Sequence, residues 1–290
     1  MRTIVLLFFF AIGMLHAVEK PLLIVVTGAR GAEEYGQNFR KWVDQWKVAS
    51  DQAKVPFKHL GEVQEGTAKS VLREILANQP KQSLQPLWIV LIGHGTYGGK
   101  KAKFNLLGPD LEAGELGKWL KDFERPLIII NCSSSSSPFL NALSAKGRVV
   151  ITATRSGFEQ NFCHLGGFLS EAISDANADL DKDGQTSLLE AWLLAARRTA
   201  AFYKERGRLA TEHSLLDDNG DGKGTPSDWF RGLALTKSSA EAGLSDGLRA
   251  HQIHLIPSGS ERELTIEQRN RRNALELSMA RLRVSKKKIK

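Results

Sequence analysis

The chain has 290 residues, of which 25% are charged and 42% hydrophobic, and its formal net charge at pH 7 is +8. This composition excludes disordered and collagen-like chains and fits a globular protein with one sizeable core and an appendage. Residues 281–290 contribute six of the excess positive charges and Arg2 contributes one, so the body carries about +1 and does not predict a nucleic-acid-binding surface.

The first 17 residues predict a secretory signal peptide. The chain begins Met-Arg, continues with an apolar run from Ile4 to Leu15, and reaches a small residue at Ala17. This run is shorter than the roughly 20 residues that span a bilayer, although an uncleaved anchor or a buried strand would share the pattern. We therefore expect cleavage after Ala17, a secreted or periplasmic location, and no stable insertion of the mature chain in a membrane.

Residues 18–174 predict an α/β domain. Short apolar runs, typical of buried strands, occur at 22–26, 87–92, 127–130 and 149–152, and residues 55–60 predict a further short strand. Segments with helical spacing lie between them, at 33–49, 67–77, 112–123 and 139–143. Strands that are apolar on both sides and alternate with helices indicate a mostly parallel sheet with helices on both faces.

The pattern changes after residue 168. Residues 175–236 predict a helical, EF-hand-like segment in which helices alternate with two Asp- and Gly-rich loops, at 175–187 and 217–225. Residues 237–290 predict a strand at 253–256 and a last helix. This helix begins at a capping box, Thr265–Gln268, and ends in the basic tail. The tail fits a solvated chain end or, less readily, a contact with anionic lipid or polymer.

The twelve residues 179–190 match an EF-hand calcium loop position by position. Calcium takes about six to eight hard oxygen atoms, which a tight loop supplies from alternate positions. Gly184 permits the sharp turn, and Glu190 would close the site with both carboxylate oxygens. The predicted ligands are Asp179, Asp181, Asp183, Gln185 through its backbone carbonyl, Ser187 and Glu190. The alternative is a solvated acidic turn.

Residues 217–228 are a weaker copy of the same loop. The candidate ligands are Asp217, Asn219, Asp221, Lys223, Thr225 and Asp228. Position twelve carries an aspartate, whose side chain reaches less far than the usual glutamate. The segment also has the features of a helix start, with Thr225 as N-cap and Pro226 at the first helical position, so occupancy of the second loop stays open.

Two of the predicted strands end on residues that could perform catalysis. His94 and Gly95 follow the strand at 87–92, and Cys132 follows the strand at 127–130. Ligand sites in open parallel sheets form beyond the carboxyl ends of the strands, so an imidazole and a thiol would meet at one edge. His94 would activate the Cys132 thiol, and the backbone N–H groups of Gly95 and Cys132 would hold an oxyanion.

The two cysteines allow other arrangements. Cys132 and Cys163 could form one disulfide, two buried thiols, or one reactive thiol with a bystander. Cys163 and His164 are a less favoured catalytic pair, because the side chains of adjacent residues diverge. The Ser133–Ser137 run lacks a G-x-S-x-G elbow and predicts a small-residue turn into a helix.

The succession of a strand ending on His94 and a strand ending on Cys132 resembles the caspase-fold cysteine peptidases, and among them most the legumain family. The resemblance covers about residues 20–170 and includes 149–154 as the strand after the cysteine. It implies a caspase-like fold and a thiol-dependent endopeptidase acting on peptides or proteins, with His94 as general base and acid and Cys132 as nucleophile. The alternative function is a catalytically inactive calcium-binding scaffold on the same fold.

Overall fold

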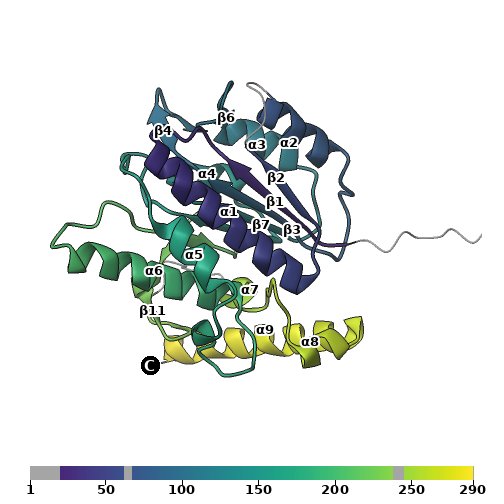
Figure 1. Cartoon of the computed structure of the whole chain (residues 1–290). Helices are drawn as coiled ribbons and strands as arrows, with labels where there is room; N and C mark the ends of the chain where they lie inside the picture. Colours follow the sequence, from purple (N-terminus) through teal and green to yellow (C-terminus); the bar gives the residue numbers. More distant parts are fainter. Residues whose placement is uncertain (1–19, 62–66, 238–244, 290) are drawn as a thin grey trace, which may run out of the picture.

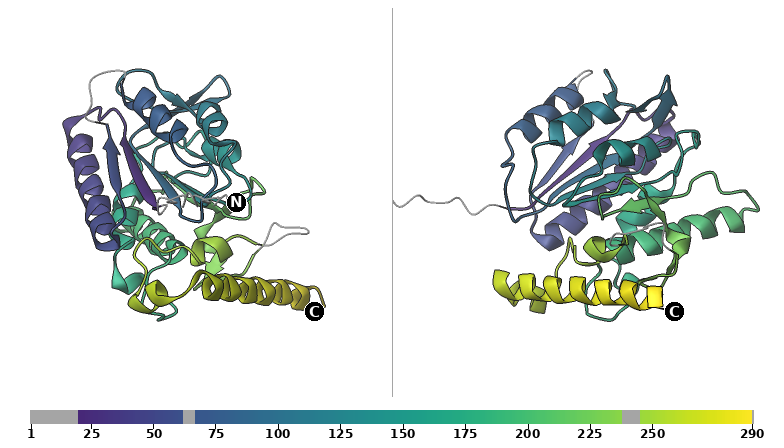
Figure 2. Two further views of the ribbon diagram at one scale, coloured as in Figure 1. Left: turned by 90° about the vertical axis from the view of Figure 1, so that its right-hand side faces the viewer. Right: turned by 180° about the vertical axis from the view of Figure 1, so that it is seen from behind.

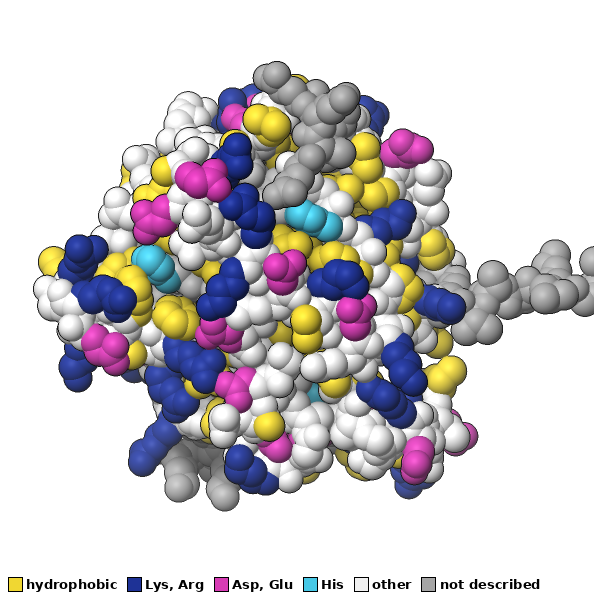
Figure 3. Space-filling model, in the orientation of Figure 1, with side chains coloured by type: hydrophobic (Ala, Val, Ile, Leu, Met, Phe, Trp, Pro, Cys, Tyr) yellow, Lys and Arg dark blue, Asp and Glu magenta, His cyan; other side chains and the backbone are white. Residues whose placement is uncertain are grey.

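The computed structural model of the chain describes residues 20–61, 67–237 and 245–289. The expected signal peptide, residues 1–17, lies outside the described residues. Within the described ranges, no helix combines the length and apolar character needed to cross a membrane. Basic and acidic side chains are interspersed over the face of the molecule shown in Figure 3, consistent with a body of nearly neutral charge.

A seven-stranded sheet forms the centre of the molecule (Figure 1). Five of its strands are parallel: β1 (Leu22–Thr27), β2 (Phe57–Leu60), β3 (Leu87–Ile92), β7 (Leu127–Asn131) and β8 (Arg148–Thr152). Two short antiparallel strands, β9 (Leu215–Asp217) and β10 (Thr225–Pro226), extend one edge, and the strand order is β10-β9-β8-β7-β3-β1-β2. The predicted mostly parallel sheet is confirmed.

Helices cover both faces of this sheet, as predicted (Figures 1 and 2). One face packs against α1 (Glu33–Ala53) and α5 (Leu165–Ala172). The other face packs against α2 (Thr67–Ala77), α3 (Ala113–Leu120) and α4 (Ser137–Leu143). A small antiparallel sheet of β4 (Gly95–Gly98), β5 (Lys101–Phe104) and β6 (Leu111–Glu112) follows β3 directly. Each face therefore has its own apolar core, and the sheet separates the two.

The segment at 175–236, expected as an appendage, contributes strands β9 and β10 to the central sheet. Its long helix, α6 (Leu188–Glu205), packs against α5. The shorter elements are the 3-10 helices η1 (Ala176–Ala178) and η2 (Ser227–Trp229) and the paired strands β11 (Phe230–Arg231) and β12 (Ala234–Leu235). The acidic loops thus lie directly beside the sheet domain.

The C-terminal part of the chain forms α7 (Leu248–His251), α8 (Gly259–Glu263) and α9 (Ile266–Ile289). The strand predicted at 253–256 is wrong, because this segment packs its apolar side chains against the α1–α5 core from outside the sheet. The capping box before α9 is confirmed: the Thr265 N–H donates to Gln268 Oε1 at 2.8 Å, and the Gln268 N–H donates to Thr265 Oγ1 at 3.2 Å. Helix α9 lies along the side of the molecule away from α2 and α3 (Figures 1 and 2).

Candidate functional site

The carboxyl ends of β3 and β7 lie side by side, as the sequence predicted. The two strands pair in register, with Leu91 opposite Asn131, so the residues that follow them meet at one edge of the sheet. His94 and Cys132 both come from this edge. The structure therefore brings together the two predicted segments, and the chemistry depends on where each side chain points.

The His94 ring is held by a backbone carbonyl and by aromatic side chains. Its Nε2 lies 3.2 Å from the Arg30 carbonyl oxygen. Because a carbonyl can only accept, this contact fits a ring protonated on Nε2, which leaves Nδ1 as the basic nitrogen. The ring centroids of Tyr35, Phe39 and Phe162 lie 5.0, 5.5 and 5.8 Å from that of His94. The Arg30 carbonyl was not predicted, since a backbone acceptor has no residue-type signature.

The Cys132 side chain lies inside the α1–α5 core. Ile128, Ile130 and Cys132 follow the two-residue period of a strand and all belong to this core. Cys132 is only 1% exposed, and a Cβ added to Gly166 of α5 would lie 2.9 Å from its Cβ. Burial, and secondarily the nearby Glu212 carboxylate, raises the pKa of the Cys132 thiol to about 12. In the described part of the chain, this thiol makes no hydrogen bond with His94.

These observations give no support to the predicted dyad, which stays a prediction. A cysteine nucleophile needs a thiolate, and a low pKa or an adjacent base normally produces it. The raised pKa keeps Cys132 protonated near neutral pH, and the core holds its sulfur away from solvent. In this structure Cys132 packs as a core side chain, and the His94 ring contacts the Arg30 carbonyl instead of the thiol.

The predicted oxyanion donors are also engaged. The Gly95 N–H donates to Ser134 Oγ at 3.1 Å, and the Cys132 N–H donates to the Leu91 carbonyl oxygen at 2.9 Å. Neither amide can hold an oxyanion without first breaking the hydrogen bond that it makes. The second contact continues the pairing of β7 with β3 by one residue, which is why Cys132 remains within the sheet.

Serines fill the space between the two strand ends. Ser134 hydrogen-bonds the Gly95 backbone, and Ser133 contacts the same turn, because a Cβ on Gly95 would lie 2.8 Å from Ser133 Oγ. The Ser133 hydroxyl donates to Asn131 Oδ1 at 2.7 Å, and the residue has no exposed surface. Helix α4 then begins at Ser137. The predicted small-residue turn into a helix is confirmed, and its hydroxyls serve packing.

The two cysteines are both free and buried, so the arrangement with two buried thiols is the one formed. The pKa of Cys163 is raised well above its ordinary value, first by burial and then by the Glu212 carboxylate. Glu212 accepts the backbone N–H groups of His164 and Leu165 at 2.7 and 3.1 Å and the Tyr203 hydroxyl at 3.1 Å. Burial raises the pKa of Glu212 to about 7 despite these donors. The Cys163–His164 pair is therefore part of a structural cluster.

The first acidic loop folds into a compact turn that gathers three carboxylates. Ligand atoms of Asp179, Asp181 and Asp183 lie within 4.8 Å of one another. The Asp179 carboxylate accepts the N–H groups of Lys182 at 2.7 Å and Gly184 at 3.1 Å, and Gly184 has the positive φ of +86° that the turn requires. Three of the predicted ligands are thus brought together, with their oxygens on one side of the turn.

The remaining side-chain ligands of this loop, Ser187 and Glu190, form a capping box at the start of α6. Glu190 is 1% exposed, and its two oxygens accept the Leu180 N–H at 2.7 Å and the Ser187 N–H at 2.8 Å. Burial first, and then the negative charges of Glu190 and Asp183, raise the pKa of Asp181. Four acidic side chains therefore share one loop, a donor set of hard oxygens that fits a calcium ion.

The second acidic loop repeats the backbone pattern of the first. In both loops, the side-chain carboxylate at position one accepts the backbone N–H groups of positions four and six. The side-chain oxygen at position three accepts the N–H of position five, and the carboxylate at position five accepts the N–H of position seven. The second loop closes differently. The Thr225 hydroxyl donates to Asp246 Oδ2 at 2.5 Å, and Asp228 lies exposed in η2. The Thr225 hydroxyl is therefore engaged by Asp246, and the helix predicted to start here is only the short 3-10 helix η2.

Two buried aspartates hold the second loop in place, and the sequence analysis missed both. Asp246 accepts the N–H groups of Asp218 and Asn219 at 2.9 and 3.2 Å, and Asp218 accepts those of Gly247 and Ala250 at 3.0 and 2.8 Å. Burial and the Asp218 charge raise the pKa of Asp246 to about 8. No local signal identifies Asp246, because it lies far from the loop in the sequence.

Comparison with known proteins gives a likeness among solved structures. No protein-family model matches the sequence, and no curated protein matches it. Among solved structures, the chain is similar to the Drosophila initiator caspase Dronc, with a TM-score of 0.44 and 14% sequence identity over 70% of this chain and 81% of that chain. The α/β architecture described above follows from the strand pairing of the chain itself.

Alkylation of Cys132 should be slow near neutral pH and independent of His94. The thiol is buried and its pKa is raised to about 12, so the reactive thiolate is a minor species. Peptide mass spectrometry after iodoacetamide treatment should give the same labelling rate in the wild type and in His94→Ala from about pH 6 to pH 9. Rapid labelling near pH 6 that disappears in His94→Ala would demonstrate an ion-paired thiolate and restore the dyad.

Glu212 should make the folded state less stable as the pH rises. Its pKa is raised from 4.5 to about 7, so between these values the folded chain holds a proton that the unfolded chain releases. The free energy of unfolding should therefore fall across this window, by at most about 3 kcal/mol from this group. Urea denaturation at several pH values should show a smaller slope for Glu212→Gln. Equal slopes in the two proteins would mean that Glu212 ionises normally.

Proposed function

We propose that this chain is a calcium-binding protein whose loop at 179–190 holds one calcium ion. The observation that carries the proposal is the gathering of Asp179, Asp181 and Asp183 within 4.8 Å, with the buried carboxylate of Glu190 folded over the same loop. Carboxylates this close repel one another unless a cation lies between them. A loop of hard oxygens with a glycine at the turn suits calcium better than a softer metal.

The ion would have a structural role. The loop connects η1 to the first turn of α6, and α6 packs against α5 on the sheet. Binding energy at the loop would therefore add to the stability of the folded chain. The loop at 217–228 is the weaker candidate, because the Thr225 hydroxyl is engaged by Asp246 and position twelve carries an aspartate, whose side chain reaches less far than glutamate.

Export belongs to the same proposal and is supported by the signal-peptide pattern of residues 1–17. Calcium sites in extracellular modules typically have dissociation constants of about 0.1–1 mM. A site of this affinity would be filled outside the cell and largely empty in a cytosol. Calcium would therefore stabilise the protein where it works and not while it is being made.

Cysteine-peptidase activity is the second candidate, and the orientation of His94 favours it. The Arg30 carbonyl holds Nε2 and leaves Nδ1 available as a base at the end of the strand beside β7. Activity would require Cys132 to leave the core in which it lies. We expect unlabelled and fluorogenic peptide libraries to stay uncleaved, with no difference between the wild type and Cys132→Ala. Hydrolysis that is lost in both Cys132→Ala and His94→Ala would establish the peptidase instead.

Calcium should raise the thermal stability of the wild type and not that of a variant with two ligands neutralised, Asp181→Asn with Asp183→Asn. Asparagine keeps the turn oxygens but removes both charges. At a free calcium concentration ten times the dissociation constant, the wild type should gain about 1.4 kcal/mol of unfolding free energy over the chelated protein. Differential scanning calorimetry in calcium and in chelator measures this gain.

Asp44→Asn, a charge neutralisation on exposed α1 surface, is the matched control and should keep the full calcium effect. Identical melting of the wild type in calcium and in chelator would contradict the calcium proposal.

A further inference from the structure

We propose that the C-terminal arm, residues 248–282, completes the calcium site of the loop at 179–190, and that calcium binding and docking of the arm are coupled. This inference rests on the proposed calcium binding. An isolated EF-hand loop usually needs a partner to hold it in its binding geometry. In this molecule the second acidic loop packs elsewhere, where its Gly222 N–H donates to Ser144 Oγ at 2.9 Å. The arm occupies the place beside the first loop.

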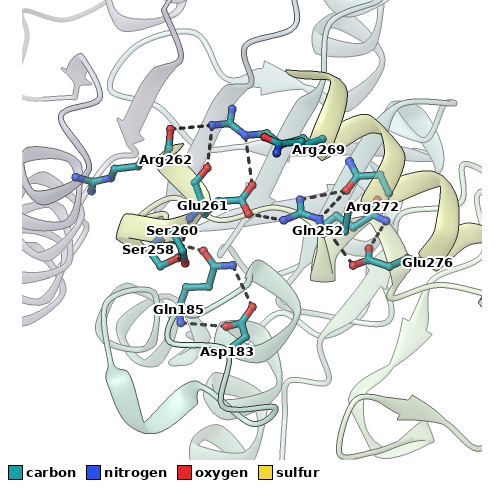
Figure 4. A network of polar contacts seen from close by, with 12 residues as sticks. Asp183, Gln185, Gln252, Ser258, Ser260, Glu261, Arg262, Arg269, Arg272 and Glu276 are labelled. Atoms are coloured by element: carbon teal, nitrogen blue, oxygen red, sulfur yellow. Dashed lines mark hydrogen bonds and ion pairs between the residues drawn. The ribbon is translucent and has the colours of Figure 1, made fainter. Parts of the chain in front are cut away.

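The side chain of Gln185 joins the loop to the arm directly (Figure 4). Its Nε2 donates to Asp183 Oδ2 at 3.0 Å, and its Oε1 accepts the Ser258 N–H at 3.0 Å. Gln185 is predicted to bind calcium through its backbone carbonyl, so its side chain is free for this second task. One amide thus fixes the carboxylate of a ligand against the N-cap residue of α8.

Two further contacts place the arm over the loop. His251 Nε2 lies 3.6 Å from Asp181 Oδ2, at another predicted ligand. The Leu188 N–H, in the first turn of α6, donates to the Ile253 carbonyl oxygen at 2.8 Å. The segment at 251–258 therefore touches loop positions three and seven and the helix start that presents Glu190.

Polar contacts carry the connection from this segment to α9 (Figure 4). Ser258 Oγ accepts the Glu261 N–H at 3.2 Å, and Glu261 forms ion pairs with Arg269 and Arg272 of α9. Gln252 Nε2 donates to Glu276 Oε2 at 2.6 Å. Among the described side chains of α9, none is fully buried. The docking of α9 thus depends on this polar network more than on apolar burial, and it is sensitive to the loop at its base.

The coupling has a direct physical cause. Without a cation, the carboxylates of Asp179, Asp181 and Asp183 repel one another within one turn, and the turn opens more readily. Opening moves Asp183 and therefore the Gln185 amide that binds Ser258. A calcium ion would hold the turn closed and keep that amide in place. By linkage, whatever docks the arm must raise calcium affinity by the same factor by which calcium favours docking.

Gln185→Ala tests the bridge from the loop side in the full-length chain. The substitution keeps the backbone carbonyl that would bind the ion and removes only the side-chain amide. We expect calcium affinity, measured by isothermal titration calorimetry, to fall by about tenfold. Hydrogen exchange of residues 259–282 should slow on calcium addition in the wild type and much less in Gln185→Ala. Gln37→Ala, the same truncation on the exposed surface of α1, is the matched control and should behave as the wild type.

Arg272→Ala tests the bridge from the arm side. Arg272 contacts no predicted ligand but pairs with Glu261 and Glu276. Lower calcium affinity in this variant is expected from reciprocity. The coupling would be overturned if the wild type bound calcium with no change in hydrogen exchange of the arm and if both variants kept the wild-type calcium affinity. That result would leave the calcium proposal standing. An absence of calcium binding by the wild type would overturn both.

Discussion

In a parallel sheet buried on both faces, each strand side chain points into one of two apolar cores. This constraint determines which side chains are available for chemistry at the carboxyl edge of the sheet. In β7, Ile128 and Ile130 point into the α1–α5 core while Leu127 and Ile129 point into the opposite core. The pairing with β3 continues through the backbone N–H of Cys132, so the same period carries its thiol into the first core. A thiol in that place is a packing group.

The acidic loops show a second constraint, the need to satisfy carboxylates that lie close together. The second loop achieves this without a cation, because Asp218 and Asp246 accept several backbone N–H groups and Thr225 donates its hydroxyl to Asp246. The first loop has a similar backbone arrangement but three carboxylates on one side and Glu190 behind them. The two loops therefore differ: under the proposed function a cation would hold the first loop, whereas hydrogen bonds within the protein hold the second.

The sequence predicted the features that depend on local periodicity and local capping. The five parallel strands, the helices on both faces, the capping box before α9 and the turn residues of the first loop all have short-range signatures. The direction of Cys132 was also accessible, since Ile128, Ile130 and Cys132 are spaced by two residues. The sequence analysis favoured the carboxyl edge of the sheet as the place of this thiol and kept a buried thiol only as an alternative.

The remaining features depend on contacts between segments that are distant in the chain. The Arg30 carbonyl that orients His94, the Asp246 carboxylate under the second loop and the Ser258 amide on Gln185 have no local signature. The apolar run at 253–256 was taken for a strand, because a short apolar segment does not tell whether it joins a sheet edge or packs against a core from outside.

The most direct test of this account is a crystal structure of the full chain grown in calcium, with diffraction recorded at a long wavelength where calcium scatters anomalously. The account predicts one strong anomalous peak coordinated by Asp179, Asp181 and Asp183 at the about 2.3–2.6 Å expected for calcium. It also predicts that Gln185 still bridges to Ser258. A map with no anomalous peak in that loop at saturating calcium would contradict the central claim.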